Sequence, residues 1–226
     1  MHQNAIANPL ARYRSATSVD AVLASPMVCD PLHLLEICAV SDGAASVVLG
    51  TEEMARNLDL PLVKVAGSAV ATGQFGDTST RIPTVSQTFG RDTTAAVLST
   101  SEVAGAAIAA REKAGVDRSD VDVLEIADNS SWHVLAWPEQ LGFLEPGQAD
   151  RMLERGDLGI GGTLAVNPSG GFLSFGEATT AQGVLQVCEL VWQLRGQATG
   201  RQVDARVAQS AVLGLGANGA SIVLTR

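Results

Sequence analysis

The sequence is poor in aromatic and in basic residues. Aromatic side chains make up 4% of its 226 residues, although hydrophobic residues make up 46%, so alanine, valine and leucine must fill the core. Lysine and arginine number 15 against 24 acidic residues, which gives a net charge of −9, and they are scattered singly. Without a basic stripe, neither nucleic acid nor an anionic membrane surface is expected as a partner. A phosphate-bearing ligand is still allowed, because helix N-termini and glycine loops supply local positive potential.

Cysteine is scarce as well, and long apolar runs are missing. Cys29, Cys38 and Cys188 are far apart, form no CxxC pair and indicate no metal site. We expect them to be buried free thiols in a reducing compartment. The N-terminus lacks a signal-peptide pattern, and no apolar run reaches the roughly 18 residues of a membrane span. These absences predict a cytoplasmic protein, and the length suits one large domain or somewhat more.

Patterns typical of strands and helices alternate along the chain. Strands are expected over 44–49, 62–70, 121–127 and 163–166, and in a C-terminal hairpin of 208–215 and 220–224 that turns at Asn218-Gly219. Helices are expected over 18–23, 51–57, 93–114, 132–141, 150–155 and 179–194, and a loop over 73–84. Two alternatives stay open: a break of the 93–114 helix near 99–101, and two short helices instead of one over 132–141. This alternation predicts a layered α/β domain that is complete from about residue 60, with roughly five strands and two long helices.

Several short motifs follow one another in a characteristic order. They are His2-Gln3-Asn4-Ala5, Asn8-Pro9, Asp30-Pro31-Leu32, Val40-Ser41-Asp42-Gly43-Ala44-Ala45, Glu125-Ile126-Ala127-Asp128-Asn129, Asn167-Pro168-Ser169-Gly170-Gly171, Gly176-Glu177 and Gly214-Leu215-Gly216-Ala217-Asn218-Gly219. In order and spacing they resemble the sterol-carrier-protein type of the thiolase superfamily, from the middle of a family chain to its C-terminus.

The resemblance implies the thiolase-like αβαβα fold, in which two similar halves with mixed sheets share a central helix layer. Residues 1–57 would be the end of the N-terminal half, and residues 58–226 the C-terminal domain. The family's nucleophilic cysteine lies in the first half, and none of the three cysteines of this chain matches its motif. Three explanations stay open: a split enzyme, a naturally truncated relative, or a fragment of a longer chain.

Two positions depart from the family's catalytic motifs. Ala127 stands where the resemblance implies the histidine of a His-Asp loop, and Glu177 stands where it implies the histidine of Gly-His-Pro. The first histidine helps to bind the thioester oxygen, and alanine cannot donate that hydrogen bond. Loss of one such donor costs about 3–4 kcal/mol of transition-state stabilisation in measured cases.

Asp128, Asn129 and His133 are candidate catalytic residues because they follow a predicted buried strand. Strand ends are where α/β sheets place their sites, and the Asn129 amide could replace the lost donor. Alternatively, Asp128 and Asn129 form an Asx turn or a helix N-cap, and His133 lies at the surface or at the edge of the core.

Glu177 is the candidate general base, since a carboxylate can take a proton when burial raises its pKa. The alternative is structural, because a negative charge is favourable at the N-terminus of the helix expected over 179–194. From the resemblance, the substrate-binding candidates are the residues of the two glycine-bearing loops: Asn167, Ser169, Gly170, Gly171, Gly214 and Gly216.

Two functions are therefore weighed. The first is a subunit or fragment of an acyl-CoA enzyme that makes or breaks a carbon–carbon bond, with coenzyme A as part of the substrate and no permanently bound cofactor. It would work with an N-terminal thiolase half or a second copy of the chain, and with a small acyl-CoA-binding protein of zinc-ribbon and OB-fold type, as in steroid side-chain cleavage. The second is a non-catalytic half that stabilises a thiolase-like partner. An ordinary thiolase that has been trimmed explains neither Ala127 nor Glu177.

Overall fold

A five-stranded mixed sheet forms the centre of the molecule. The computed structural model describes residues 1–58, 61–73, 101–214 and 218–226. The strands are β3 (Lys64–Thr72), β4 (Val123–Ile126), β5 (Ala165–Val166), β6 (Val207–Gly214) and β7 (Asn218–Thr225), in the spatial order β3-β7-β6-β4-β5. Strand β4 is parallel to β5 and β6, whereas β7 is antiparallel to β6 and β3. The prediction of an α/β fold with about five strands in this part of the chain is confirmed.

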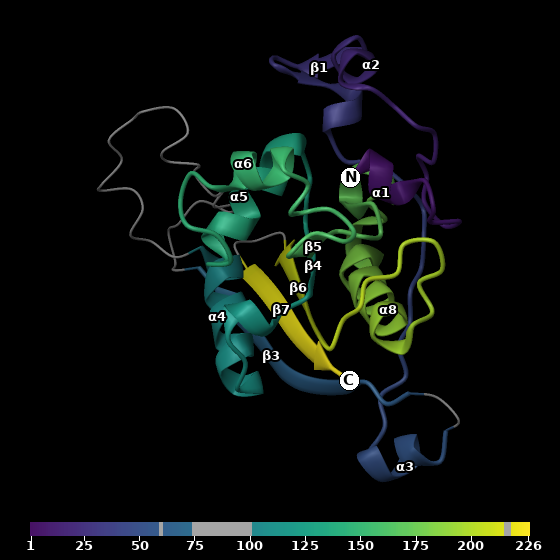
Figure 1. Cartoon of the computed structure of the whole chain (residues 1–226), viewed down its shortest axis with the longest axis vertical. Helices are drawn as coiled ribbons and strands as arrows, with labels where there is room; N and C mark the ends of the chain where they lie inside the picture. Colours follow the sequence, from purple (N-terminus) through teal and green to yellow (C-terminus); the bar gives the residue numbers. More distant parts are fainter. Residues whose placement is uncertain (59–60, 74–100, 215–217) are drawn as a thin grey trace.

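Two long helices cover the opposite faces of this sheet (Figure 1). Helix α4 (Glu102–Ala114) packs on β3 and β7, and helix α8 (Gln182–Arg195) packs on β6, β4 and β7. The side chains of β4 alternate between the two layers, because Leu124 and Ile126 join the cluster under α4 while Val123 joins the cluster under α8. All four residues of β4 are buried, as expected for a strand covered on both faces.

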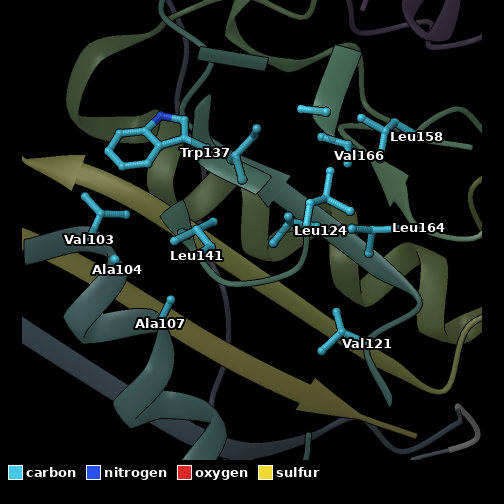
Figure 2. Packing of buried hydrophobic residues seen from close by; sticks show 14 residues of the cluster. Val103, Ala104, Ala107, Val121, Leu124, Trp137, Leu141, Leu158, Leu164 and Val166 are labelled. Carbon is cyan, nitrogen blue, oxygen red and sulfur yellow. The ribbon is translucent and has the colours of Figure 1, made fainter. Parts of the chain in front are cut away.

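The larger apolar cluster lies between the sheet and helices α4 and α5 (Ser131–Gln140) (Figure 2). Trp137 is its largest side chain and is 1% exposed. Its indole N–H donates to the Ala127 carbonyl at 2.9 Å, so the buried ring also fixes the chain where it leaves β4. Small alanine side chains of α4 supply much of the opposing surface, so this core is filled although aromatic residues are few.

Local signals in the sequence explain the ends of the long helices. The Ser101 hydroxyl accepts a hydrogen bond from the Ala104 N–H at the start of α4, and Gly115 ends the helix with a φ of 67°. Gly196 ends α8 in the same left-handed conformation, with a φ of 72°. The expected first part of the α4 helix, 93–100, and most of the expected loop 73–84 lie outside the described residues.

The N-terminal segment carries short elements that lie mostly away from the sheet (Figure 1). They are α1 (His2–Ala5), α2 (Val19–Leu23), β1 (Met27–Cys29), β2 (Leu32–His33), η1 (Leu34–Glu36) and α3 (Glu52–Arg56). The remaining elements of the chain are η2 (Arg118–Asp120), α6 (Ala149–Glu154), α7 (Gly171–Ser174) and η3 (Thr179–Ala181). The helices predicted near 18–23 and 51–57 are confirmed. No helix within the described ranges is both long enough and apolar enough to cross a membrane.

Three sequence expectations are wrong. Residues 44–49 form no strand, and Val48 is 98% exposed, because no neighbouring strand of the described chain is available to pair with them. Asn218 and Gly219 belong to β7, where they pair with Gly214 and Leu213, so they do not form the predicted turn. The cysteines are not buried: Cys29 lies exposed in the projecting β1, and the other two are half-buried.

Gly67 and Gly105 should respond in opposite directions to substitution by alanine. A Cβ on Gly67 of β3 would overlap the Ala110 carbonyl oxygen and lie 2.8 Å from the Ala114 nitrogen, because α4 crosses the strand closely there. We expect Gly67→Ala to destabilise the chain by up to about 3 kcal/mol. Gly105 lies within α4, where a Cβ would meet Ala71 at an ordinary 3.8 Å, so Gly105→Ala should stabilise by about 0.5–1 kcal/mol. Urea unfolding of both variants measures the difference; equal effects would contradict it.

Candidate active site

The parallel strands β4, β5 and β6 all end at one edge of the sheet. Residues 127–130 follow β4, residues 167–171 follow β5, and Gly214 ends β6. Ligand sites of open α/β sheets lie beyond the carboxyl ends of such strands. The structure therefore places most of the predicted site residues in one region, while Gly216 lies outside the described residues.

The carboxylate of Asp128 is fully buried beneath the start of α7. Its Oδ1 accepts the Phe172 N–H at 2.7 Å, while Oδ2 has no hydrogen-bond partner among the described residues. Burial raises the pKa of Asp128 to about 7, and the hydrogen bond from Phe172 opposes this rise. A Cβ on Gly171, whose φ is 64°, would overlap both carboxylate oxygens, so only glycine fits over this side chain.

Because the pKa of Asp128 is raised, we expect Asp128→Asn to increase the stability of the chain by an amount that depends on pH. The native carboxyl contributes stability while it is protonated, and this contribution is lost as the pH rises from about 4 through about 7. Asparagine keeps the oxygen that accepts from Phe172 and carries no charge. We therefore expect the free energy of unfolding of the variant to match that of the parent near pH 4 and to exceed it by roughly 2–4 kcal/mol at pH 8. Urea unfolding across this range tests the slope, and a constant difference between the two proteins would contradict it.

Asn129 and Glu177 form a second, half-buried polar pair beside Cys38. The Asn129 amide Nδ2 donates to Glu177 Oε1 at 3.1 Å. Cys38 joins them through the main chain, because its N–H donates to the Asn129 carbonyl at 2.9 Å. The Glu177 N–H donates to the Ala39 carbonyl at 2.8 Å, so three distant segments meet at this point.

The carboxylate of Glu177 points to Asn129 rather than to a helix end. The residue that caps η3 is Ala178, and no side-chain hydrogen bond caps either η3 or α8. The arrangement is chemically that of a carboxylate held by an amide donor at the edge of the sheet. Such a group can accept a proton, and its catalytic role stays a prediction.

His133 is held as a neutral ring at the start of α5. Its Nδ1 accepts the Ser130 N–H at 3.1 Å, which places the ring proton on Nε2. The ring packs between Trp132 and Trp137, with centroid distances of 5.2 and 6.0 Å. Burial lowers the pKa of His133 to about 4. At neutral pH the ring is a donor through Nε2, and its assignment as a catalytic residue stays a prediction.

The buried loop after β5 is hydrogen-bonded both to strand β4 and to the N-terminal segment. Asn167 clamps β4, because its Oδ1 accepts the Ile126 N–H at 2.7 Å and its Nδ2 donates to the Ile126 carbonyl at 3.2 Å. Ser169 donates to Glu125 through its hydroxyl at 2.8 Å and its N–H at 3.1 Å. From the N-terminal segment, Asn8 Nδ2 donates to the Ser169 carbonyl at 2.8 Å. These contacts fix the loop that carries Gly170 and Gly171.

Three residues organise this region although the sequence analysis assigned them no role in it: Glu125, Asn8 and Cys38. Glu125 is 1% exposed and anchors Ser169; burial raises its pKa well above the ordinary value, and the nearby Glu189 charge acts in the same direction. A single carboxylate inside an otherwise apolar strand was the available signal for Glu125. No local pattern marks Cys38, since its neighbours come from distant segments.

A cavity of about 520 Å³ lies near this region, and Gly176 and Ala178 on either side of Glu177 take part in its wall. Its lining is completed by Leu10, Arg12, Ser41, Asp42, Gly43, Ala44, Phe175, Gln182 and Leu185. The wall thus combines an arginine and an aspartate with apolar side chains. Asp128, Asn129 and the Glu177 carboxylate lie outside this lining.

Comparisons with known proteins identify the class to which this fold and these loops belong. Residues 86–226 match the family described as thiolase C-terminal domain-like. The chain belongs to the thiolase family, as the resemblance predicted. The solved structure titled Ltp2-ChsH2(DUF35) aldolase superposes with a TM-score of 0.78 at 24% identity, covering 99% of this chain and 55% of that one, so the two share the fold.

Individual relatives carry several activities in their names. Acetyl-CoA acetyltransferase of Methanothermobacter thermautotrophicus is 38% identical over 90% of this chain and 49% of its own length. Sterol carrier protein 2 of Homo sapiens is 35% identical over 95% of this chain and 38% of its own length. The benzoylsuccinyl-CoA thiolase subunit BbsB of Thauera aromatica is 33% identical, with coverages of 95% and 52%. The chain spans about half the length of these relatives or less.

Proposed function

We propose that this chain supplies the C-terminal half of an acyl-CoA enzyme that makes or breaks a carbon–carbon bond next to a thioester, with Glu177 as the general base. The observation that carries the proposal is the Asn129–Glu177 pair of 3.1 Å at the edge of a thiolase-fold sheet. The relatives include proteins named as an acetyl-CoA acetyltransferase, a benzoylsuccinyl-CoA thiolase subunit and an aldolase, and these names support the choice of reaction class.

A retro-aldol cleavage needs few groups from the protein. Glu177 takes the proton of the β-hydroxyl, the bond between the α and β carbons breaks, and its electron pair forms a thioester enolate. The amide N–H of Asn129 is the candidate donor to the enolate oxygen, in place of the histidine absent at Ala127. Protonation of the α carbon by Glu177 then completes the cycle, so no nucleophilic cysteine is consumed.

Coenzyme A, as part of the substrate, and the partner chain belong to the proposal. An N-terminal thiolase half would cover the N-terminal segment, and a zinc-ribbon and OB-fold protein would present the acyl-CoA, with steroid or other lipid acyl groups as the substrate class.

The test joins this chain to the thiolase-type N-terminal half from the same organism, on one polypeptide or as two chains. Mass spectrometry should then detect cleavage of a β-hydroxyacyl-CoA into a carbonyl compound and a shorter acyl-CoA. A correctly assembled complex that turns over no β-hydroxyacyl- or β-ketoacyl-CoA would overturn the proposal.

A second candidate function, a stabilising half without chemistry, is favoured by a different observation. The segment 44–49 leaves Val48 98% and Leu49 77% exposed, an apolar surface that a partner chain could cover. Retention of the buried Asp128 and the clamped loop fits this function too, because both hold the fold together.

The exposed segment predicts that the isolated chain associates. We expect a dimer or larger species in multi-angle light scattering at micromolar concentration, since contiguous apolar surface is rarely left open in a soluble monomer. The double variant Val48→Lys/Leu49→Lys should shift the population to monomer, because paired lysines block strand addition. The matched control is Met54→Lys, which places one charge on the exposed surface of α3, where Met54 is 64% exposed. A monodisperse parent monomer would contradict the expectation.

A further inference from the structure

Helix α1 packs against the loop that follows β5. Ala5 of this helix is fully buried, and a Cβ on Gly170 would lie 2.6 Å from the Ala5 Cβ, so only glycine allows this approach. The side chain of Asn4 donates through Nδ2 to two consecutive carbonyls, those of Val166 at 3.2 Å and Asn167 at 3.0 Å. One residue of α1 therefore holds the point where the loop leaves the strand.

Helix α1 is itself fixed on both sides of Asn4. At its start, His2 Nε2 donates to the Leu35 carbonyl at 2.8 Å, and His2 Nδ1 lies 2.8 Å or less from its partner, the Ser174 hydroxyl, at 2.7 Å. Beyond its end, the fully buried Asn8 donates to the same loop. The Asn4 amide is therefore a donor in a defined place and not a mobile surface group.

The main chain at Asn167 has a conformation that needs such support. Its φ is 47°, in the left-handed region that residues other than glycine seldom adopt. A residue stays in this region only where the surrounding contacts hold it there. The Asn167 N–H donates to the Leu124 carbonyl at 2.8 Å and its side chain clamps Ile126, while Asn4 holds its carbonyl from the other side.

The position of the loop is passed on to the proposed base. The Asn167 carbonyl also accepts the Gly170 N–H at 3.0 Å. The carbonyl of the next residue, Gly171, accepts the Gly176 N–H at 3.3 Å, and Gly176 directly precedes Glu177. A shift of the main chain at Asn167 therefore moves the main chain next to Glu177.

We propose that Asn4 is a positioning residue of the active-site loop, and that its two hydrogen bonds hold Asn167 in the left-handed conformation from which the loop reaches Glu177. The inference rests on the proposed function in its catalytic part, and on geometry alone in its structural part. Both bonds of Asn4 go to main-chain carbonyls, so its effect on the chemistry is indirect and passes through the loop.

The first experiment needs no catalytic activity. Hydrogen–deuterium exchange of the intact chain, measured by mass spectrometry, reports the opening of a peptide that covers 167–176. We expect Asn4→Ala to speed the exchange of this peptide by about five- to thirtyfold, because the loop loses two hydrogen bonds. Peptides of β6 and β7 should keep the parent rates. An equal acceleration there would show a general loss of stability and overturn the structural part of the inference.

Two matched variants separate the hydrogen bonds from other changes in α1. Gln3→Ala alters the neighbouring residue of the same helix, whose side chain is exposed, and should leave the exchange of 167–176 unchanged. Asn4→Asp keeps the shape of the side chain but loses its N–H donors, so it should loosen the loop at least as much as Asn4→Ala. Parent-like exchange in either Asn4 variant would overturn the structural part, and so would an equal acceleration in Gln3→Ala.

The second experiment uses the assembled enzyme in a double-mutant cycle. Asn4→Ala should lower kcat about ten- to a hundredfold and change KM less than about threefold, because a small misplacement of the loop affects the reaction more than binding. In the Glu177→Gln background the same substitution should lower kcat less than about threefold, since its effect passes through Glu177. Equal losses of kcat in both backgrounds would overturn the catalytic part. An inactive parent would overturn the proposed function and the catalytic part with it, whereas the exchange rates still decide the structural part.

Discussion

Glu177→Gln should lower kcat of the assembled enzyme by about 10²–10⁴-fold and leave KM almost unchanged. A positioned general base contributes this much to proton transfer, and glutamine cannot accept the proton. The carboxamide has the same shape, and its oxygen can still accept the Asn129 amide that now bonds Glu177 Oε1 at 3.1 Å. Substrate binding and the fold should therefore survive. Steady-state kinetics on a β-hydroxyacyl-CoA, with the shorter acyl-CoA quantified, measures both constants.

The control for this prediction is Glu154→Gln, which removes the charge of an exposed glutamate at the end of α6. Both variants change the net charge of the chain by the same amount, so any general electrostatic effect on an anionic CoA substrate cancels between them. Glu154→Gln should retain the parent kcat. A Glu177→Gln enzyme that keeps more than half of the parent kcat would remove Glu177 from the mechanism. If Asp128→Asn also kept it, neither of the two carboxyl groups predicted to be catalytic would have a role in the chemistry.

The fold could be predicted from the sequence where local and long-range signals agree. Gly115 marks the C-terminal end of α4, the apolar run of β4 marks a doubly covered strand, and two apolar runs on either side of a glycine-bearing stretch mark the hairpin of β6 and β7. The same local reasoning failed at 44–49, because a β-branched run becomes a strand only if another strand is available to pair with it. Within the described residues no such strand lies beside it.

The candidate site could be predicted in part for a similar reason. Asp128, Asn129 and Asn167 follow strands, so the topology of a parallel sheet brings them to one edge. The partner of Glu177 could not be foreseen, because Asn129 lies 48 positions away in sequence and the pair depends on how two loops pack. Cys38 was missed for the same reason, since its contact partners are likewise distant along the chain.

Arg201→Met should destabilise the chain by about 3–5 kcal/mol, the largest stability effect expected of any single substitution of an ion-pair residue here. Arg201 forms a bidentate ion pair with Glu189, in which Nη2 donates to Oε2 at 2.8 Å and Nε donates to Oε1 at 3.0 Å. The two side chains are 6% and 0% exposed. Methionine fills much of the volume but leaves the carboxylate buried without its cation.

An exposed ion pair provides the comparison for this prediction. Arg118 and Glu145 meet at 3.0 Å, but their side chains are 52% and 63% exposed, so Arg118→Met should cost no more than about 1 kcal/mol. Arg201→Lys keeps the positive charge but loses the bidentate geometry, so its stability cost should fall between those of Arg201→Met and Arg118→Met. The double variant Arg201→Met/Glu189→Leu removes both charges and should recover most of the loss, because the penalty belongs to the unpaired carboxylate and not to the missing attraction. Urea unfolding at pH 7 ranks the four variants; an Arg201→Met cost equal to that of Arg118→Met would show that water reaches Glu189.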